Sequence, residues 1–490
     1  MLGPRTPILV GAGTSYDDAE AVELMVRATE AAAKDAGTTD ILRAVQRVAV
    51  PRGTWSYSDP GRIVAERIGA ADAHTHLVDL GIPQQTLINQ ALTAIMSGDL
   101  EVALVVGAEA KARAARAAQR SHAANAEGLR TVFRRENETG EIDQQGAQPD
   151  VHQTPQGEFL AMPEIQAGLY APVEQYALME SALRAHDGLT IEQHRRQIAE
   201  LCARFNAVAR TNPDAAFPID TNAAALAELG AGNRPLAFPY GKWHASQWTV
   251  DQAAALLLCS VEAAERFGID RERWLFPLVG IESSASVSLT KRRDLHRWPA
   301  MRVLAEAAAD HVGHDLSACA HQEVYSCFPL AVRVQQRELA LPVDGTPTIT
   351  GGMTFAGGPF NSFVLQATAA MAQRLRSEPG EALITTVSGM LTKPGLAVWA
   401  NEPGNTPPLV HDFADEALAA TPTVDVVSSY DGPATIAAYT VTYDGQEPKE
   451  LVAVVDTADG SRAIAKRSDP ELLARATTEE LIGTTLEPAP

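Results

Sequence analysis

Short runs of consecutive apolar residues alternate along this chain with stretches in which apolar residues recur every three or four positions. Residues 7–11 (PILVG) and 102–106 (VALVV) are two such runs, and each ends at or beside a glycine. Residues 19–36 lie between them and carry alanine, leucine and methionine at the spacing of one helix face. Continuous apolar runs are typical of parallel strands covered on both faces. The pattern therefore predicts an α/β fold.

Three of these segments recur in the same order later in the chain, which predicts that an α/β half of the protein is duplicated. The pairs are PILVG ending at Gly11 with FPLVG ending at Gly280, Gly81-Ile-Pro83 with Gly357-Gly358-Pro359, and LVVG ending at Gly107 with TVSG ending at Gly389, at offsets of 269, 276 and 282 residues.

The rest of the chain has a different pattern. Residues 172–184 and 191–209 have helical spacing and follow a polar stretch, so we expect an inserted loop subdomain there. Residues 434–443 and 450–455 have strand character and are separated by turn signals, which favours a small antiparallel β-barrel of OB type. The predicted domains are an N-terminal half (1–124), a loop subdomain (125–245), a C-terminal half (246–407) and the barrel (408–490).

Composition and charge narrow the partners. Of the 490 residues, 40 are Lys or Arg and 61 are Asp or Glu, which gives a formal net charge of −21. Such acidity argues against nucleic acid and against an anionic membrane surface. No apolar run is long enough to span a bilayer, and the chain starts without a signal-peptide core, so the cytoplasm is the expected location. We expect the four cysteines to be reduced thiols.

Two places have candidate chemistry. Each repeat puts a glycine and a proline at the start of a predicted helix, and a helix start presents free N–H groups that can hold an oxyanion. The segment 321–329 brings Tyr325 and Cys327 to the end of a predicted strand, where open α/β sheets place ligands. The alternatives are a capped helix without a ligand, and a tyrosine and cysteine that belong to the core.

Histidines offer weaker signals. His244 lies in a polar and aromatic cluster where it is either an acid or base or a structural residue. The series Cys319, His321 and Cys327 fits no zinc template, and neither does the pair His74 and His76. We therefore predict no metal.

Several longer motifs resemble the thiolase superfamily. QTLINQALTAIMSG (85–98) and DLEVALVVGAEA (99–110) are similar to the helix and strand that follow the thiolase nucleophile. TWSYSDPGRIVAERIGA (54–70), SQWTVDQAAALLLCS (246–260) and YSCFP (325–329) resemble more narrowly the thiolase-like protein type 1 group. This resemblance implies a layered α/β/α/β/α thiolase fold and a relation to acyl-CoA thioesters.

The same resemblance implies that the thiolase catalytic groups are missing. The nucleophile position falls on Gly81, and the Gly-His-Pro motif becomes Gly357-Gly358-Pro359. The late Cys-x-Gly motif ends here in Ser388-Gly389, and Tyr325 stands where thiolases have a water-holding asparagine. Losing such groups together costs orders of magnitude in rate, so we predict no appreciable thiolysis.

Three functions stay open: a non-catalytic binder of acyl-CoA, a retro-aldolase-like lyase that uses Tyr325, and an acyltransferase whose nucleophile is Cys327. No cofactor beyond the coenzyme A thioester is expected, and both a monomer and a homodimer are compatible with the sequence. The candidate substrate-binding residues are Gly81, His244, Ser246, Gly357, Gly358, Ser388 and Gly389.

Overall fold

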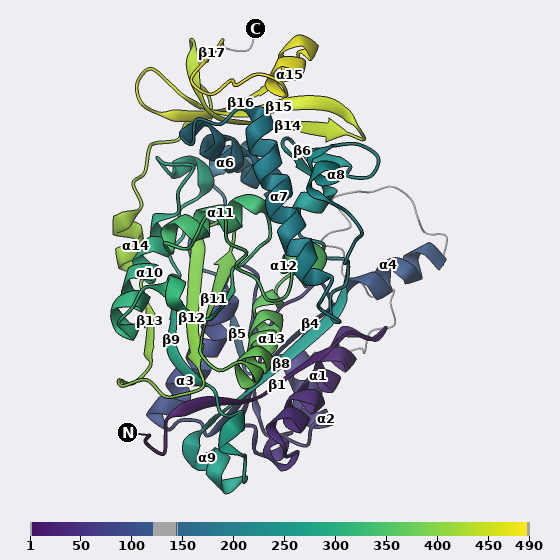
Figure 1. Cartoon of the computed structure of the whole chain (residues 1–490), viewed down its shortest axis with the longest axis vertical. Coiled ribbons are helices and arrows are strands. Elements are labelled where there is room, and N and C mark those ends of the chain that lie inside the picture. The colour runs from purple at the N-terminus through teal and green to yellow at the C-terminus, as the bar shows by residue number, and fades with distance from the viewer. Residues whose placement is uncertain (1, 121–143, 145, 488–490) are drawn as a thin grey trace.

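The computed structural model describes residues 2–120, 144 and 146–487 (Figure 1). Its larger part has five layers, in which two mixed sheets enclose a central layer of helices and each carries helices on its outer face. The helices of these layers are α1 (Ala21–Ala36), α2 (Pro60–Arg67), α3 (Gln84–Ser97), α10 (Pro299–Val312), α11 (Pro329–Glu338) and α13 (Phe363–Ser377). The predicted layered α/β/α/β/α arrangement is confirmed.

The first sheet has the strand order β1-β8-β4-β2-β3-β5. Its strands are β1 (Pro7–Ser15), β2 (Arg47–Pro51), β3 (His74–Val78), β4 (Val102–Ala110), β5 (Val151–Gln153) and β8 (Asp251–Ser260). Helices α1 and α2 cover its outer face, and the apolar side chains of β4 and β8 are buried on both faces. The continuous apolar runs of the sequence therefore correspond to doubly covered strands.

The second sheet has the order β10-β11-β12-β9-β13. Its strands are β9 (Phe276–Glu282), β10 (His321–Glu323), β11 (Glu381–Ser388), β12 (Lys393–Ala400) and β13 (Leu409–Asp412). The path β9-β12-β11-β10 repeats the path β1-β8-β4-β2, with an antiparallel strand second and a parallel pair at the end in both. This match confirms the duplication that the recurring segments predict.

Strand β8 has a consequence for the domain boundaries. It lies antiparallel between β1 and β4, so it completes the first sheet although it follows the loop subdomain in sequence. The predicted boundary at residue 246 therefore separates this strand from the half to which it belongs. An antiparallel partner that is distant in sequence leaves no local signal of its sheet.

Helices α3 and α13 form the central layer, because both contact strands of both sheets. Glycine allows the close approach of α3 to the second sheet: a Cβ on Gly280 would lie 2.6 Å from Asn89 Oδ1. Helix α3 ends at Gly98, whose φ of 84° closes the helix with its N–H bonded back to the last turn.

Most of the loop subdomain and of the C-terminal residues forms a region on top of the layers, drawn in teal and yellow in Figure 1. Its helices are α5 (Met162–Gln166), α6 (Pro172–His186), α7 (Ile191–Ala209), α8 (Ala223–Ala227) and α15 (Pro470–Ala476). Its strands are β6 (Pro235–Ala237), β7 (Tyr240–Gly241), β14 (Ala434–Asp444), β15 (Glu447–Asp456), β16 (Arg462–Arg467) and β17 (Thr485–Leu486). The helices and hairpin predicted over 172–209 and 434–455 are present.

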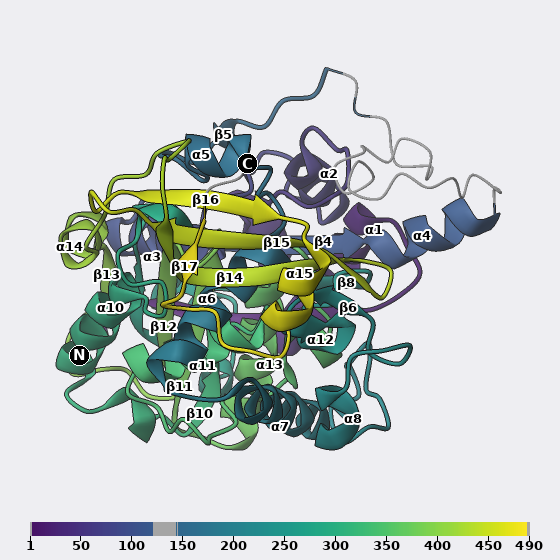
Figure 2. The same cartoon turned by 90° about the horizontal axis from the view of Figure 1, so that it is seen from above.

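Strands β14, β15 and β16 lie across the top of the molecule above α6 (Figure 2). The pairs among the described strands follow the open path β16-β15-β14-β6-β7, with β17 beside β14. An OB-type barrel is therefore not confirmed. Two strands of this sheet, β6 and β7, come from the loop subdomain, so the C-terminal sheet is shared between two predicted domains.

Buried arginines join this sheet to α6 and to the second half of the layered part. Arg184 of α6 lies within 2.8 Å of Glu480 and donates to the Tyr439 hydroxyl at 2.9 Å. Arg462 of β16 donates to the carbonyl oxygen of Arg292 in the second half. Hydrogen bonds from charged groups are strong when water is excluded, so the C-terminal region is held rigidly on the core. Within the described residues, no helix is long and apolar enough to cross a bilayer.

Candidate functional site

The starts of the two central helices lie side by side. Gln84, the first residue of α3, accepts a hydrogen bond from the backbone N–H of Val364 in the first turn of α13, at 2.7 Å. Helix α13 begins at Phe363 and not directly after Pro359, because a turn closed by Ser362 N–H on the Pro359 carbonyl, at 2.8 Å, precedes it. The duplication thus brings both candidate helix starts to one place.

Tyr325 lies at this junction. Its ring meets Phe363 of α13 edge-on at 5.7 Å, and its hydroxyl hydrogen-bonds with the Gln84 side chain of α3. Its backbone N–H donates to Thr385 Oγ1 at 2.8 Å, which fixes the strand end. Burial, with Cys327 nearby, raises the pKa of Tyr325 far above its usual value of 10. The hydroxyl is therefore protonated at neutral pH.

Cys327 lies two residues further on and is held in a different way. Burial raises the pKa of its thiol to about 12, although a hydrogen bond with Tyr176 of α6 opposes the shift. Tyr176 stacks on Phe328 at 4.5 Å between ring centres. A nucleophilic cysteine needs a lowered pKa, so this thiol is not activated. All four cysteines are free, as predicted, and Cys202, Cys259 and Cys319 are buried.

The four glycines at the predicted site do not border open space. An ideal Cβ on Gly358 would lie 2.0 Å from Ser246 Oγ, and one on Gly389 would lie 2.2 Å from Thr392 Oγ1. On Gly357 it would lie 2.7 Å from the Gln252 amide, and on Gly81 it would lie 3.1 Å from Pro155 Cβ. In this structure, neighbouring protein atoms occupy the space that these glycines leave.

The segment over residues 155–159 lies against two of these glycines, Gly81 and Gly389. Pro155 lies against Gly81, and the Phe159 ring comes within 3.8 Å of a Cβ position on Gly81 and 3.1 Å of one on Gly389. The sequence gives no signal of this role, because the segment lies between a polar stretch and α5 and has no periodicity.

Lys393 is a further residue that the sequence analysis missed. Its ammonium group donates to the carbonyl oxygens of Gly81 and Gln156, each at 3.0 Å, and its side chain is buried at the start of β12. Burial lowers its pKa. The single cation in the otherwise apolar segment KPGLAVWA is the only sequence signal for it. Lys393 ties the loop before α3 to the second sheet.

The other predicted residues divide into two groups. Ser246 belongs to the junction, because its N–H donates to the Cys327 carbonyl at 2.9 Å. Ser388 is buried and pairs across the sheet with Lys393. His244 is fully buried, and its ring nitrogens meet the N–H of Gly241 at 3.1 Å and the Leu226 carbonyl at 2.9 Å. Burial lowers the pKa of His244 to about 4, so its ring is neutral at pH 7.

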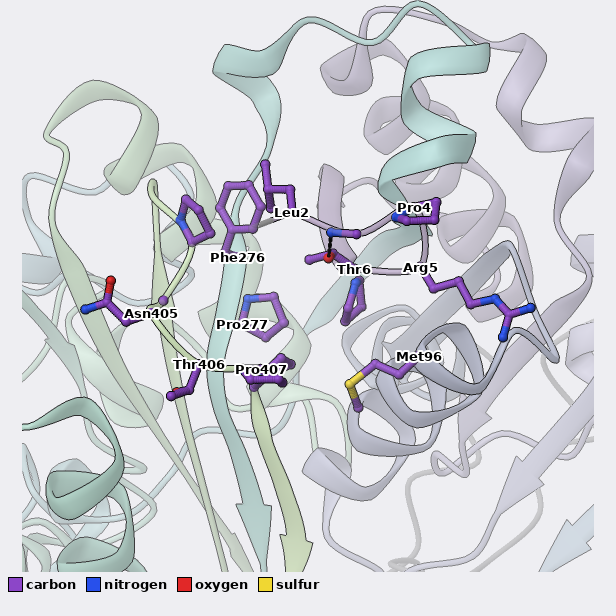
Figure 3. A pocket seen from close by; sticks show the side chains of 15 residues that line it. Leu2, Pro4, Arg5, Thr6, Met96, Phe276, Pro277, Asn405, Thr406 and Pro407 are labelled. Atoms are coloured by element: carbon purple, nitrogen blue, oxygen red, sulfur yellow. Dashed lines mark hydrogen bonds between the residues drawn. The ribbon is translucent and has the colours of Figure 1, made fainter.

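Cavities elsewhere do not extend the site. The cavity in Figure 3, of about 450 Å³, lies where β1 and β9 begin and where α3 ends, and is lined mostly by prolines and apolar side chains such as Leu2 and Phe276. Helix α3 has 14 residues, so this cavity is roughly 20 Å from Gly81. Among the residues that the structure describes, no three His, Cys, Asp or Glu side chains are grouped to hold a metal ion.

Comparisons with known proteins bear on both parts of the chain. Residues 414–487 match the family model of the thiolase-like protein type 1 additional C-terminal domain. No curated protein matches. The crystal structure of a monomeric SCP2-thiolase like protein type 1 from Mycobacterium smegmatis is 28% identical, with a TM-score of 0.83 over 100% of this chain and 98% of that chain.

Two more distant structures share the fold alone. Human mitochondrial 3-ketoacyl-CoA thiolase is 16% identical, with a TM-score of 0.58 over 82% of this chain and 100% of that one. The Ltp2-ChsH2(DUF35) aldolase is 16% identical, with a TM-score of 0.56 over 81% of this chain and 99% of that one.

Proposed function

The chain is a type 1 thiolase-like protein of the thiolase superfamily, and we propose that it binds acyl-CoA thioesters without catalysing the thiolase reaction. One observation carries the proposal: the loop that leads into α3 at the junction of the two central helices has Gly81 three positions before the helix, and this residue has no side chain to acylate. A helix start favours an oxygen that bears negative charge, and at α13 such an oxygen would compete with Gln84 for the Val364 N–H.

The neighbouring thiol does not replace the missing nucleophile. Cys327 is next to Tyr325, but its pKa of about 12 keeps it protonated at neutral pH. An acyltransferase that uses Cys327 is therefore the least supported of the three candidate functions.

A lyase that uses Tyr325 is the second candidate. It is supported by the placement of the Tyr325 hydroxyl on Gln84, at the start of α3, and by the fold shared with the Ltp2-ChsH2(DUF35) aldolase. In a retro-aldol cleavage of a β-hydroxyacyl-CoA, the β-hydroxyl loses its proton, the Cα–Cβ bond breaks to release an aldehyde or ketone, and the acyl-CoA enolate takes up a proton. The protonated Tyr325 hydroxyl suits the protonation of the enolate, and the β-hydroxyl proton would pass to water. Release of an aldehyde or ketone by the wild type, lost in Tyr325→Phe, would make the protein a lyase and would refute a purely binding role.

Binding is tested by calorimetric titration with acetyl-CoA and decanoyl-CoA. We expect binding of at least one thioester, and we expect Ser246→Trp to abolish it because Ser246 lies between Cys327 and Gly358. Ser468→Trp is the control, since Ser468 is exposed in the C-terminal region. Absence of heat and of thermal stabilisation with both thioesters would refute the proposal.

Catalysis is tested separately with acetoacetyl-CoA and coenzyme A. We expect no thiolysis above the rate without protein. Turnover at rates typical of enzymes, about 1–1,000 per second, would contradict the assignment of Gly81 to the nucleophile position.

A further inference from the structure

A cavity of about 390 Å³ lies on the outer helical face, far from the junction described above. It is formed by the end of α6, the residues just before α10, the first turn of α10 and the end of α11. Tyr325 precedes α11, and the cavity lies at the other end of this ten-residue helix, about 15 Å along it.

Three arginines and two histidines line this cavity, in a chain whose net charge is −21. Arg297 and Arg302 converge on the buried carboxylate of Glu338, with nitrogen–oxygen distances of 3.1 and 2.8 Å. The Trp298 N–H donates to the same carboxylate at 3.1 Å. Arg337 binds Asp187 through both of its terminal nitrogens. Each carboxylate thus orients a guanidinium group; Arg302 also donates to the Arg337 carbonyl oxygen at 3.2 Å, and a guanidinium group has five N–H donors, more than these contacts use.

The two histidines form a pair. The rings of His186 and His296 stack with their centres 3.9 Å apart and their planes inclined by 15°. Neither ring has a hydrogen-bond partner within the part of the chain that the structure describes. Burial, followed by His186 and the arginines Arg297 and Arg337, lowers the pKa of His296, although Asp294 opposes the shift.

The residues that line the cavity carry an excess of positive charge. Arg297, Arg302 and Arg337 supply three positive charges and Glu338 supplies one negative charge, whereas Asp187 and Asp294 act on these arginines from outside the lining. One arginine is enough to neutralise Glu338. The charge of Glu338 therefore does not explain why a second arginine and two stacked imidazoles lie beside it. Guanidinium groups are suited to oxyanions because their N–H groups match two oxygens at once.

We propose that this cavity binds a phosphate group, carried by a phosphate monoester or present as inorganic phosphate. A volume of about 390 Å³ lies within the range of ordinary small-molecule sites, which leaves room for an organic group beside the phosphate. The exposed face of His186 lies where a flat group can stack. The site is separate from the junction and does not depend on the proposed thioester binding.

Calorimetric titration at constant ionic strength tests this proposal, with inorganic phosphate, adenosine 5′-monophosphate and adenosine as probes. We expect the monophosphate to bind and adenosine not to bind. Arg337→Gln should weaken binding at least tenfold, and Asp187 keeps its contact with Arg333 in that variant. Arg266→Gln is the matched control, because Arg266 forms a similar two-nitrogen pair with Glu101 outside the cavity.

A second variant, His186→Ala, covers the case in which Arg337→Gln does not fold. His186 is exposed and makes no hydrogen bond with any other residue that the structure describes, so this change should weaken binding and leave the unfolding temperature unchanged. Equal affinity for phosphate and the monophosphate would assign the site to free phosphate. No binding of either, equal binding of adenosine, or equal weakening by Arg266→Gln would overturn the proposal.

Discussion

Replacing Gly81 by cysteine is the most direct test of why this protein has no thiolase nucleophile. Gly81 has a φ of 99°, a conformation that costs a residue with a side chain about 1–3 kcal/mol. The new Cβ would also lie 3.1 Å from Pro155 Cβ, and overpacking of this kind adds about 1–3 kcal/mol. We therefore expect Gly81→Cys to lower the free energy of unfolding by about 2–6 kcal/mol, the sum of these two costs.

Gly313→Cys separates the two contributions. Gly313 ends α10 with a φ of 83°, and no heavy atom lies within 4 Å of its Cβ position. This control carries the backbone strain without the packing conflict, so it should lose only about 1–3 kcal/mol. Urea unfolding followed by circular dichroism measures both variants, and the difference between them is the cost of displacing Pro155.

The same Gly81→Cys variant should remain inactive in thiolysis of acetoacetyl-CoA. A helix start lowers the pKa of a thiol, so the new side chain has a favourable position. Gly358 supplies no imidazole, and Val387, at the cysteine position of the Cys-x-Gly motif that ends at Gly389, supplies no second thiol. Removal of one group of a catalytic set already costs orders of magnitude. Wild-type stability of the variant, or turnover by it, would refute the geometric argument.

Three further outcomes are expected. At pH 7.5, a pKa of about 12 leaves only ~3 × 10⁻⁵ of Cys327 as thiolate. Iodoacetamide should therefore react with Cys327 at least a thousandfold more slowly than it reacts with the thiol of glutathione. Rapid formation of a single adduct, seen by mass spectrometry, would contradict this. Burial raises the pKa of Glu282 to about 7, so the folded state binds a proton that the unfolded state releases near pH 4.5. The free energy of unfolding should therefore fall by up to about 3 kcal/mol as the pH rises from 4.5 to 7. In the Glu282→Gln variant the urea midpoint should depend less steeply on pH over this range, and equal pH dependence in the variant and the wild type would refute the prediction. Strand β5 pairs with the outer edge of β3, so this edge is not available for pairing with a second copy of the chain. Light scattering at micromolar concentration should therefore give a monomer of 52.2 kDa, and a species of twice that mass would count against this prediction.

Local patterns predicted the elements that the core requires. The runs at 7–11 and 102–106 are strands because both of their faces are covered, and only a continuous apolar segment satisfies that environment. Helix α7 covers 191–209, the residues with helical spacing, since its start at Thr190 is capped by that side chain. The recurrence of Gly81 and Gly357 also predicted that two helix starts meet, because a duplicated fold brings equivalent positions together.

Contacts between distant residues could not be predicted in this way. Lys393 hydrogen-bonds to a carbonyl 312 residues away, and the packing of Phe159 on Gly81 and Gly389 joins three separate segments. No periodicity records such contacts, because they depend on how complete elements dock. For the same reason the position of β8, between β1 and β4, followed from the sheet and not from the sequence.

Glycines in a site make room either for a ligand or for the protein itself, and the contacts here favour the second function. Pro155 and Phe159 occupy the space at Gly81, and this segment is anchored by the hydrogen bond from Ser286 Oγ to the Glu158 carbonyl at 2.9 Å and by the ion pair of Lys291 with Glu158. A thioester that reaches Gly81 must displace this segment. The apparent affinity is then the intrinsic affinity reduced by the fraction of molecules in which the segment is displaced. The two contacts of Glu158 therefore contribute to the binding free energy at Gly81, although they lie outside that site. Their contribution is modest, because an exposed ion pair is weak.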